Sequence, residues 1–258
     1  MSEIISSEQR HNEIVHLLTQ QGRVTVTEIV DCFSISEATA RRDLEALAEK
    51  GRIQRVRGGA LPVTQAPPEL PILQREQDQA YAKKMIGQAA ASLIQEGEAI
   101  LLGSGSTVLE VARHLQQRQN LTVITNSLPV MNTLANVAGI TIVSLGGVLR
   151  PTELSFIGHI TEQSLSEVRV DKVFLGVHAI SLEQGLTSDF LPEIMTDRTL
   201  LKAGREVIVV ADHTKVNTVS TAYLTPINTM NTFVTDPGAP AEFVKGLEKL
   251  GIRVLIAG

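Results

Sequence analysis

Residues 36–60 of this 258-residue chain read SEATARRDLEALAEKGRIQRVRGGA. Ser36 is a residue type that caps helices, and apolar residues then recur at helical spacing until Gly51. Residues 52–57 alternate charged and apolar side chains, as a short strand does, and lead into a Gly-Gly turn. The stretch predicts a helix followed by a basic hairpin, with arginines placed where the grooves and phosphates of a DNA duplex could meet them.

The residues before this stretch complete the pattern. A helix is predicted over 8–21, ended by Gly22, followed by an extended piece at 24–26 and a second helix over 27–33. Two helices, a tight turn, a third helix and a hairpin constitute a winged helix-turn-helix. The predicted DNA contacts are the side chains that its core does not claim: Ser36, Glu37, Thr39, Arg41, Arg42, Arg52, Arg55 and Arg57.

The positive charge of this region is local. The formal net charge of the chain is −5, whereas residues 41–60 carry six lysines and arginines, including Lys50, against three acids. The alternative to DNA binding is that Arg41 and Arg42 only pair with Glu37 and Glu45 on a solvated helix face. The complete helix-turn-helix pattern favours DNA binding over that alternative.

The composition excludes several other classes of protein. Only 3% of the residues are aromatic, which disfavours a protein that stacks on unpaired bases. Cys32 is the only cysteine, so no intrachain disulfide forms, and we expect it to pack in the small domain's core. No apolar run approaches the roughly 18 residues of a membrane span, and the N-terminus does not resemble a signal peptide. We expect a cytoplasmic protein with no membrane partner.

A proline-rich segment separates this region from the rest of the chain. Residues 62–71, PVTQAPPELP, contain four prolines and predict a stiff, extended linker. The length suits one small domain and one larger one. We therefore predict a DNA-binding domain at 1–61, a linker at 62–73 and an effector-sensing and oligomerisation domain at 74–258.

Beyond a predicted helix at 74–95, short apolar strands alternate with helices. The strands are expected at 99–102, 122–125, 140–145, 172–177, 207–211, 232–235 and 253–256. The helices are expected near 106–117, 127–137, 159–167, 192–203 and 240–249. Strands without polar alternation, separated by helices, predict an α/β fold of the Rossmann-like kind, with a mainly parallel sheet covered on both faces.

A ligand site is predicted where these strands end. Gly103-Ser104-Gly105-Ser106-Thr107 follows one strand and opens a helix, so that its free amides favour an anion such as a phosphate. The alternative is a plain strand-to-helix turn with a Ser/Thr cap. Ligands of open α/β sheets collect at the carboxyl ends of strands. The further residues expected at that edge are Thr125, Asn126, Gly146, Gly147, Arg150 and Lys215.

Residues 8–60 resemble the DNA-binding domain of the DeoR family of bacterial transcriptional regulators. The matching residues are Arg10, Ile14, Val24, Val26, Phe33, Ser36, Thr39, Arg41-Arg42-Asp43-Leu44, Leu47, Gly51 and Arg55-Val56-Arg57-Gly58-Gly59-Ala60. The resemblance implies a repressor of a sugar or carbohydrate catabolic operon that binds operator double-stranded DNA as a homodimer or homotetramer.

Residues 75–256 resemble the sensor domain of the same family, which is related to ribose phosphate isomerases and coenzyme A transferases. The matching motifs are Ser104–Thr107, Thr125–Ser127, Leu145–Gly147, Leu149-Arg150, Gly158, Val170–Lys172, Phe174–Gly176, Gly185–Thr187, Ala211-Asp212 and Lys215. The resemblance implies a small phosphorylated sugar or related metabolite as effector.

Three positions depart from the family pattern. Gly103 stands where an acid is common, Val177-His178-Ala179 where Ala-Asp-Gly is common, and Asp197 where a basic residue is common. Two carboxylates that could hold sugar hydroxyls are therefore expected to be missing. His178 either substitutes for them as a ligand contact or is a packed or capping histidine, and the sequence favours neither.

The residues do not favour an enzyme. A phosphosugar isomerase needs a positioned carboxylate, but residues 176–180 contain none, and Glu193 is expected to be solvated. Asp189 and Asp197 are expected on the polar face of a helix. Histidines at metal-binding spacing and Cys/His clusters are absent from the sequence, so we expect no metal and no cofactor. The alternative function is a phosphosugar isomerase-like enzyme with a DNA-binding appendage.

Overall fold

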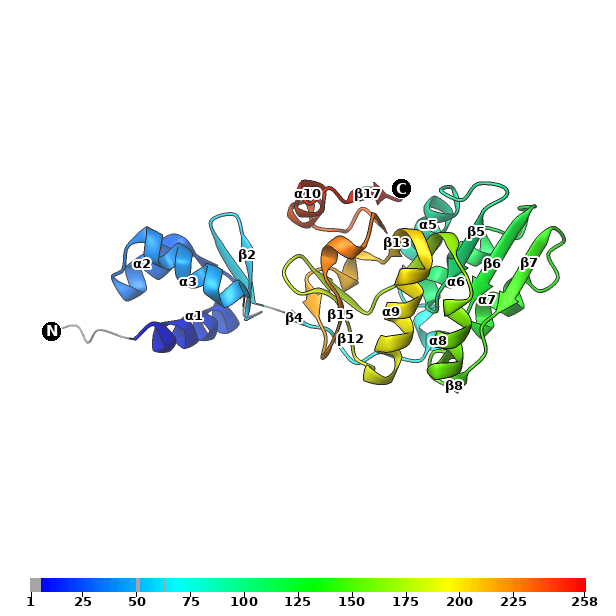
Figure 1. The fold of residues 1–258 in the computed structure, drawn as a ribbon. Coiled ribbons are helices and arrows are strands. Elements are labelled where there is room, and N and C mark those ends of the chain that lie inside the picture. Colours follow the sequence, from blue (N-terminus) through cyan, green and yellow to red (C-terminus); the bar gives the residue numbers. More distant parts are fainter. Residues whose placement is uncertain (1–5, 50–51, 63) are drawn as a thin grey trace. The chain divides into compact units, whose positions relative to one another are not determined.

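The computed structural model describes residues 6–49, 52–62 and 64–258. The chain divides into two compact units, Met1–Gln65 and Ala66–Gly258, which are described here one at a time (Figure 1). Lys50 and Gly51, at the expected end of the third helix, lie outside the described residues. Residues 66–73 of the predicted linker fall within the second unit.

The first unit is a winged helix-turn-helix, as the sequence predicts. Ser6 and Thr25 begin its first two helices, and each side chain accepts a bond from the backbone of Gln9 or Glu28, whose own side chain bonds back. Three of its strands form an antiparallel sheet in the order β1-β3-β2. The elements are α1 (Ser7–Gln21), β1 (Val24–Thr25), α2 (Val26–Phe33), α3 (Glu37–Glu49), β2 (Ile53–Val56), β3 (Gly59–Pro62) and β4 (Thr64–Gln65).

The core of the first unit consists of the predicted apolar stripes. Ile14 of α1, Ile29 of α2 and Leu44 of α3 are fully buried in one cluster. The expectation that Cys32 packs in this core was wrong, because α2 buries Val26 and Ile29 and leaves Cys32 exposed on another side of the helix.

A buried ion-pair network fastens α3 to α1. The Arg10 guanidinium donates to both carboxylate oxygens of Asp43, at 2.6 and 3.0 Å, and His11 Nε2 lies 3.0 Å from Asp43 Oδ1. Burial by itself raises the pKa of Asp43, but the bonds from Arg10 and His11 outweigh it and hold the pKa below its usual value. Asp43 is therefore ionised at neutral pH and joins the two helices.

Replacing this carboxylate is expected to loosen the first unit. Asp43→Asn leaves Arg10 with an incomplete partner in a buried place, and we expect a loss of about 3 kcal/mol in the free energy of opening. Because the folded pKa is lowered, the contribution of Asp43 is complete above the ordinary value of 3.8 and disappears as the pH falls through the lower folded value. Hydrogen exchange of the α1 and α3 amides in the full chain measures the change.

Glu45→Gln is the matched control on the same helix. Glu45 is 64% exposed in its side chain and lies 3.5 Å from Arg55, so its removal should leave exchange close to that of the unaltered protein. Equal protection in the two variants would contradict the role given to Asp43.

The second unit is built on a seven-stranded sheet in the order β17-β16-β13-β10-β5-β6-β7, with every neighbouring pair parallel. Each of the seven predicted strands is present, so the α/β fold class is confirmed. The strands are β5 (Ala99–Leu102), β6 (Leu121–Thr125), β7 (Ile140–Ser144), β10 (Val170–Gly176), β13 (Gly204–Val210), β16 (Thr232–Thr235) and β17 (Arg253–Ile256).

Helices cover both faces of this sheet. Phe174 of β10 packs in one cluster with residues of α5, α6 and α7, whereas its neighbour Val173 packs in another with residues of α8, α9 and α10. Figure 1 shows α8 and α9 side by side. The helices are α4 (Ile72–Arg75), α5 (Ala80–Ala91), α6 (Ser106–Arg113), α7 (Leu128–Leu134), α8 (His159–Ser166), α9 (Ile194–Ala203) and α10 (Ala241–Lys249).

Smaller elements surround the carboxyl edge of the sheet. The strands β8 (Val148–Arg150) and β9 (Ser155–Ile157) form a hairpin, and β11 (Ala179–Ser181), β12 (Gly185–Ser188) and β15 (Ala222–Thr225) form an antiparallel sheet. The remaining pieces are β14 (Thr218–Val219) and three 3₁₀ turns at Leu191–Glu193, His213–Lys215 and Ile227–Thr229. Within the described ranges, no helix combines the length and the apolar character that a membrane crossing requires.

Candidate functional site

The strand order marks one place in the large sheet. From the middle of the sheet, β5, β6 and β7 follow one another toward one edge. Strands β10, β13, β16 and β17 follow one another toward the opposite edge. The loops that follow β5 and β10 therefore diverge, and such a switch point is where open α/β sheets bind ligands.

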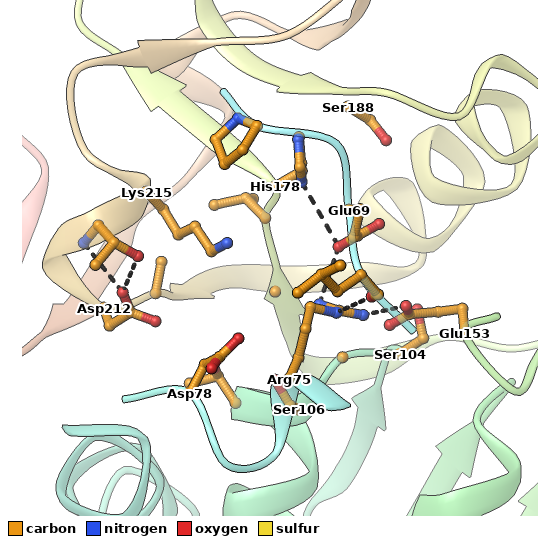
Figure 2. A pocket seen from close by; sticks show the side chains of 18 of the residues that line it. Glu69, Arg75, Asp78, Ser104, Ser106, Glu153, His178, Ser188, Asp212 and Lys215 are labelled. Atoms are coloured by element: carbon orange, nitrogen blue, oxygen red, sulfur yellow. Dashed lines mark hydrogen bonds and ion pairs between the residues drawn. The ribbon is translucent and has the colours of Figure 1, made fainter. Parts of the chain in front are cut away.

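A cavity of about 330 Å³ lies at this switch point (Figure 2). Its walls include Ser104–Thr107 after β5, Gly176–His178 after β10 and residues 211, 212, 214 and 215 after β13. Its size is within the usual range for pockets that hold small molecules. The remaining lining residues are Pro67, Pro68, Glu69, Leu70, Arg75, Asp78, Gln79, Lys83, Arg150, Glu153, Thr187, Ser188, Glu193, Asp197 and Leu224.

Most of the predicted ligand contacts line the cavity, and five do not. The lining residues among them are Ser104, Gly105, Ser106, Thr107, Arg150, His178 and Lys215. The five others follow strands farther from the switch point or face the sheet: Gly103, Thr125, Asn126, Gly146 and Gly147.

Two of those five residues, Asn126 and Gly147, have evident local structural roles. Asn126 holds the β9 backbone, since its Nδ2 donates to the Phe156 carbonyl at 3.0 Å. Gly147 has a φ of +145°, and a Cβ there would lie 2.2 Å from Thr161 Oγ1 on α8. The glycine therefore permits the close approach of the turn after β7 to α8.

One end of the cavity is suited to an anion. Gly105 has a φ of +117° and immediately precedes α6, so that free amides of the first turn face the cavity. Lys215 and Lys83 also line it, and Lys83 is only 5% exposed. Burial lowers the pKa of the Lys83 ammonium, and the nearby cations Lys215 and Arg75 add to this effect although Asp212 opposes it. An anion placed between these cations would stabilise their charge.

The other end of the cavity holds a network of acids and arginines. Glu69 joins both arginines, with its Oε1 2.9 Å from Arg75 Nη1 and its Oε2 3.4 Å from Arg150 Nη2. Arg75 also pairs with Glu153, and Arg150 with Glu193. Figure 2 shows Glu69, Arg75 and Glu153 meeting at the cavity wall.

The charges of this network are strongly coupled. Burial raises the pKa of Glu69, but His178, Arg75 and Arg150 outweigh it and lower the value to about 2. Burial raises the pKa of Glu153 to about 7, because the neighbouring carboxylates Glu69 and Glu193 reinforce it and Arg75 only partly compensates. Glu69 is therefore a permanent anion, whereas Glu153 changes protonation near neutral pH.

Sequence reasoning missed these acids. Glu193 was expected to be solvated, but it is 4% exposed and accepts from Ser155 Oγ at 2.9 Å. Asp197 was expected on a solvated helix face, but it borders the cavity. Positions 103 and 178 carry no carboxylate, but segments outside the matched motifs supply other carboxylates to the cavity. Glu69 was within the proline-rich stretch, whose composition pointed only to a linker.

His178 is a buried polar side chain without a hydrogen bond. It is 6% exposed, and neither ring nitrogen has a hydrogen-bond partner among the described residues. Its Nδ1 lies 3.7 Å from Glu69 Oε1, too far for a hydrogen bond. Of the two roles considered for His178, the one as a ligand contact agrees better with its bare nitrogens and its place in the cavity wall.

A cation could in geometry be held by His178, Glu69 and Asp189, each of which offers one ligand atom within 4.8 Å of the others. The electrostatics disfavour it, because Glu69 already pairs with two guanidinium groups. Asp189 Oδ2 also accepts the Glu69 amide at 2.8 Å. The absence of a metal therefore stays a prediction.

In the first unit, the predicted DNA contacts lie on α3 and the hairpin. Ser36 Oγ accepts the Thr39 amide at 3.2 Å, which makes it a helix cap. Arg41 pairs with Glu37 at 2.5 Å, and Arg55 with Glu45 at 3.5 Å. Arg42, Arg52 and Arg57 are exposed and have no ion-pair partner within residues 6–49, 52–62 and 64–258.

Comparison with known proteins places both units in one family. Residues 10–66 match the DeoR-like helix-turn-helix domain, and residues 78–237 match the DeoR C terminal sensor domain. Among solved structures, the chain is similar to ribose 5-phosphate isomerase A from Methanocaldococcus jannaschii, at 20% identity and a TM-score of 0.39, over 52% of this chain and 53% of that one.

Curated relatives match over nearly the whole chain. The transcriptional repressor AccR of Agrobacterium fabrum is 35% identical over 98% of each chain. The glycerol-3-phosphate regulon repressor of Escherichia coli is 34% identical over 93% of this chain and 94% of that one. The transcriptional repressor GlcR of Bacillus subtilis is 33% identical over 96% of each chain. The matches to both domain models and the matches to full-length relatives point to the same family. The chain therefore belongs to the DeoR family of transcriptional regulators.

Proposed function

We propose that this chain is a sequence-specific DNA-binding repressor of a carbohydrate catabolic operon, controlled by a phosphorylated sugar or related metabolite. Residues 1–61 bind operator DNA, residues 74–258 sense the metabolite, and residues 62–73 connect the two activities. The names of the relatives, which include a glycerol-3-phosphate regulon repressor, support this assignment.

The observation that carries the proposal is the cavity itself. It joins the glycine turn before α6 with two lysines from other segments, Lys83 and Lys215. Amides at a helix start and convergent ammonium groups are the groups that recognise phosphate in proteins. The volume of about 330 Å³ is enough for a sugar phosphate.

The path of the chain supports a coupling between ligand and DNA binding. Residues 67–70, which directly follow the first unit along the chain, form part of the cavity wall. They are held there by the bond from the Glu69 amide to Asp189 and by the two arginines on the Glu69 carboxylate. A ligand that contacts Arg75 or Arg150 competes with Glu69 for that arginine. It therefore weakens a contact that holds the segment leading to the DNA-binding unit.

A helix-turn-helix protein commonly reads two half-sites, so we propose that the chain acts as a homodimer or homotetramer in the cytoplasm. We further propose that the cavity binds its metabolite without converting it. Three carboxylates in its wall, those of Glu69, Glu153 and Glu193, are engaged by arginines, and the curated relatives are named as regulators.

The experiment is a thermal-shift screen of pentose, hexose and triose phosphates, followed by DNA binding. Duplexes that the protein selects from a random library serve as the operator probe. At least one phosphate should raise the melting temperature and change the duplex Kd, because a ligand that binds the folded state stabilises it. The same compounds, incubated with pure protein, should remain unconverted. Conversion at enzymatic rates, or stabilisation by none of them, contradicts the proposal.

A further inference from the structure

The cavity carries more negative than positive groups. Its lining contains six carboxylates and four lysine or arginine side chains. Lys83 and Lys215 line the same cavity as the glycine turn, where the phosphate is expected. The arginines, Arg75 and Arg150, are already engaged by three acids, Glu69, Glu153 and Glu193. The acid-rich end therefore has a surplus of carboxylate before Asp197 is counted.

Asp197 adds to this surplus and has no partner of its own. No hydrogen bond or ion pair to its carboxylate is found in the described parts of the chain. Burial raises the pKa of Asp197 well above its ordinary value, and the nearby carboxylates Glu193 and Glu153 raise it further against the opposing effect of Arg150. A carboxylate surrounded by like charges is stabilised by a proton or by a cation.

His178 is an independent sign that the same region awaits a ligand. It is 6% exposed, lines the cavity, and has two ring nitrogens without a hydrogen-bond partner among the described residues. Figure 2 shows it beside Glu69. Buried polar groups in native proteins are normally satisfied, so bare nitrogens in a cavity wall indicate a polar ligand group.

We propose that the metabolite is a phosphorylated amino sugar, whose phosphate lies at the glycine turn with Lys83 and Lys215 and whose ammonium group is received by Asp197 in the acid-rich end of the cavity. This inference rests on the proposed function. An ammonium supplies the positive charge that the acid-rich end lacks, whereas a hydroxyl in the same position supplies none. Asp197 is then the residue that selects the amino sugar.

The departure at position 197 agrees with this assignment. Position 197 of this chain is an acid, which offers a negative charge to a ligand in the cavity. Opposite charges at one position of a pocket discriminate between ligands through repulsion as well as attraction.

The test compares ligands that differ in one group. Glucosamine 6-phosphate and glucose 6-phosphate differ only in an ammonium in place of a hydroxyl, and the galactose pair offers the same comparison. N-acetylglucosamine 6-phosphate keeps the nitrogen and removes the charge. Calorimetry with the full chain should give about 10-fold tighter binding for at least one amino sugar than for its hydroxyl and N-acetyl counterparts.

Asp197→Asn should reduce that preference to within about threefold. Glu242→Gln, an exposed acid in the first turn of α10, is the control and should keep the full preference. Circular dichroism melts establish that the variants are folded.

The outcomes separate this inference from the function on which it rests. Sugar phosphates that bind without preference for the amine overturn the inference and leave the sensing function standing. A preference that survives in Asp197→Asn overturns the role of Asp197. If no sugar phosphate binds, both the inference and the proposed ligand class fall.

Discussion

Gly105→Asp is expected to abolish the response to a phosphorylated metabolite and to leave DNA binding intact. Gly105 has a φ of +117°, a conformation that L side chains rarely adopt, so any side chain strains the turn before α6. The Cβ of the added side chain would lie 3.9 Å from Glu153 Oε1, and its carboxylate would lie beside the turn where the phosphate is expected. Repulsion between two anions there should cost about 2 kcal/mol, or about 30-fold in affinity, beyond the strain.

Gly105→Asn separates the two causes, because it has the same shape without the charge. Both variants share the backbone strain, so the difference in their affinities for the best sugar phosphate of the thermal-shift screen measures the repulsion. The melting temperature without ligand and the Kd for the selected duplex show whether the damage is confined to the cavity. If the Asp variant binds the sugar phosphate as tightly as the Asn variant does, the phosphate does not bind at this turn.

Arg42→Ala is expected to weaken operator binding by about 1–3 kcal/mol and to relax the sequence preference. Arg42 is exposed on α3 and has no ion-pair partner in the described residues, whereas its neighbour Arg41 is engaged by Glu37. A free guanidinium can make two parallel hydrogen bonds to guanine or contact a phosphate. The Kd for the selected duplex and for a scrambled one, each at two salt concentrations, measures the effect.

Two further variants calibrate this result. Arg41→Ala should cost less than Arg42→Ala, because Arg41 must first leave Glu37. Arg205→Ala removes an arginine of the second unit whose side chain is 86% exposed, and should leave the Kd unchanged. If Arg42→Ala keeps full affinity and preference at both salt concentrations, Arg42 is not a reader of DNA.

The sheet and its helices were predictable because local patterns encode them. Strands buried on both faces are continuous apolar runs, and all seven strands of the parallel sheet were recognisable from such runs. The hairpin β8–β9 and the sheet β11-β12-β15 were not predicted, since they are short and their polar residues do not alternate regularly. The helix expected over 74–95 is two helices, α4 and α5, with Gln79 between them at a φ of +51°.

The cavity was only half predictable for a related reason. The glycine turn at 103–107 is recognisable in the sequence, because phosphate-binding turns need glycine and free amides at a helix start. Glu69, Glu153 and Glu193 carry no such local sign. They reach one network from positions far apart in the chain through arginines that the sequence does not pair with them.

The sequence alone determined that the chain has a winged helix-turn-helix and an α/β unit with a glycine turn before a helix, because helix caps, apolar spacing and glycines act over a few residues. Only the tertiary structure decided which acids share a cavity with that turn. The order of strands in a sheet is set by packing between distant segments, and it is the adjacency of β5 and β10 that opens the cavity and brings Asp197 and His178 to its wall.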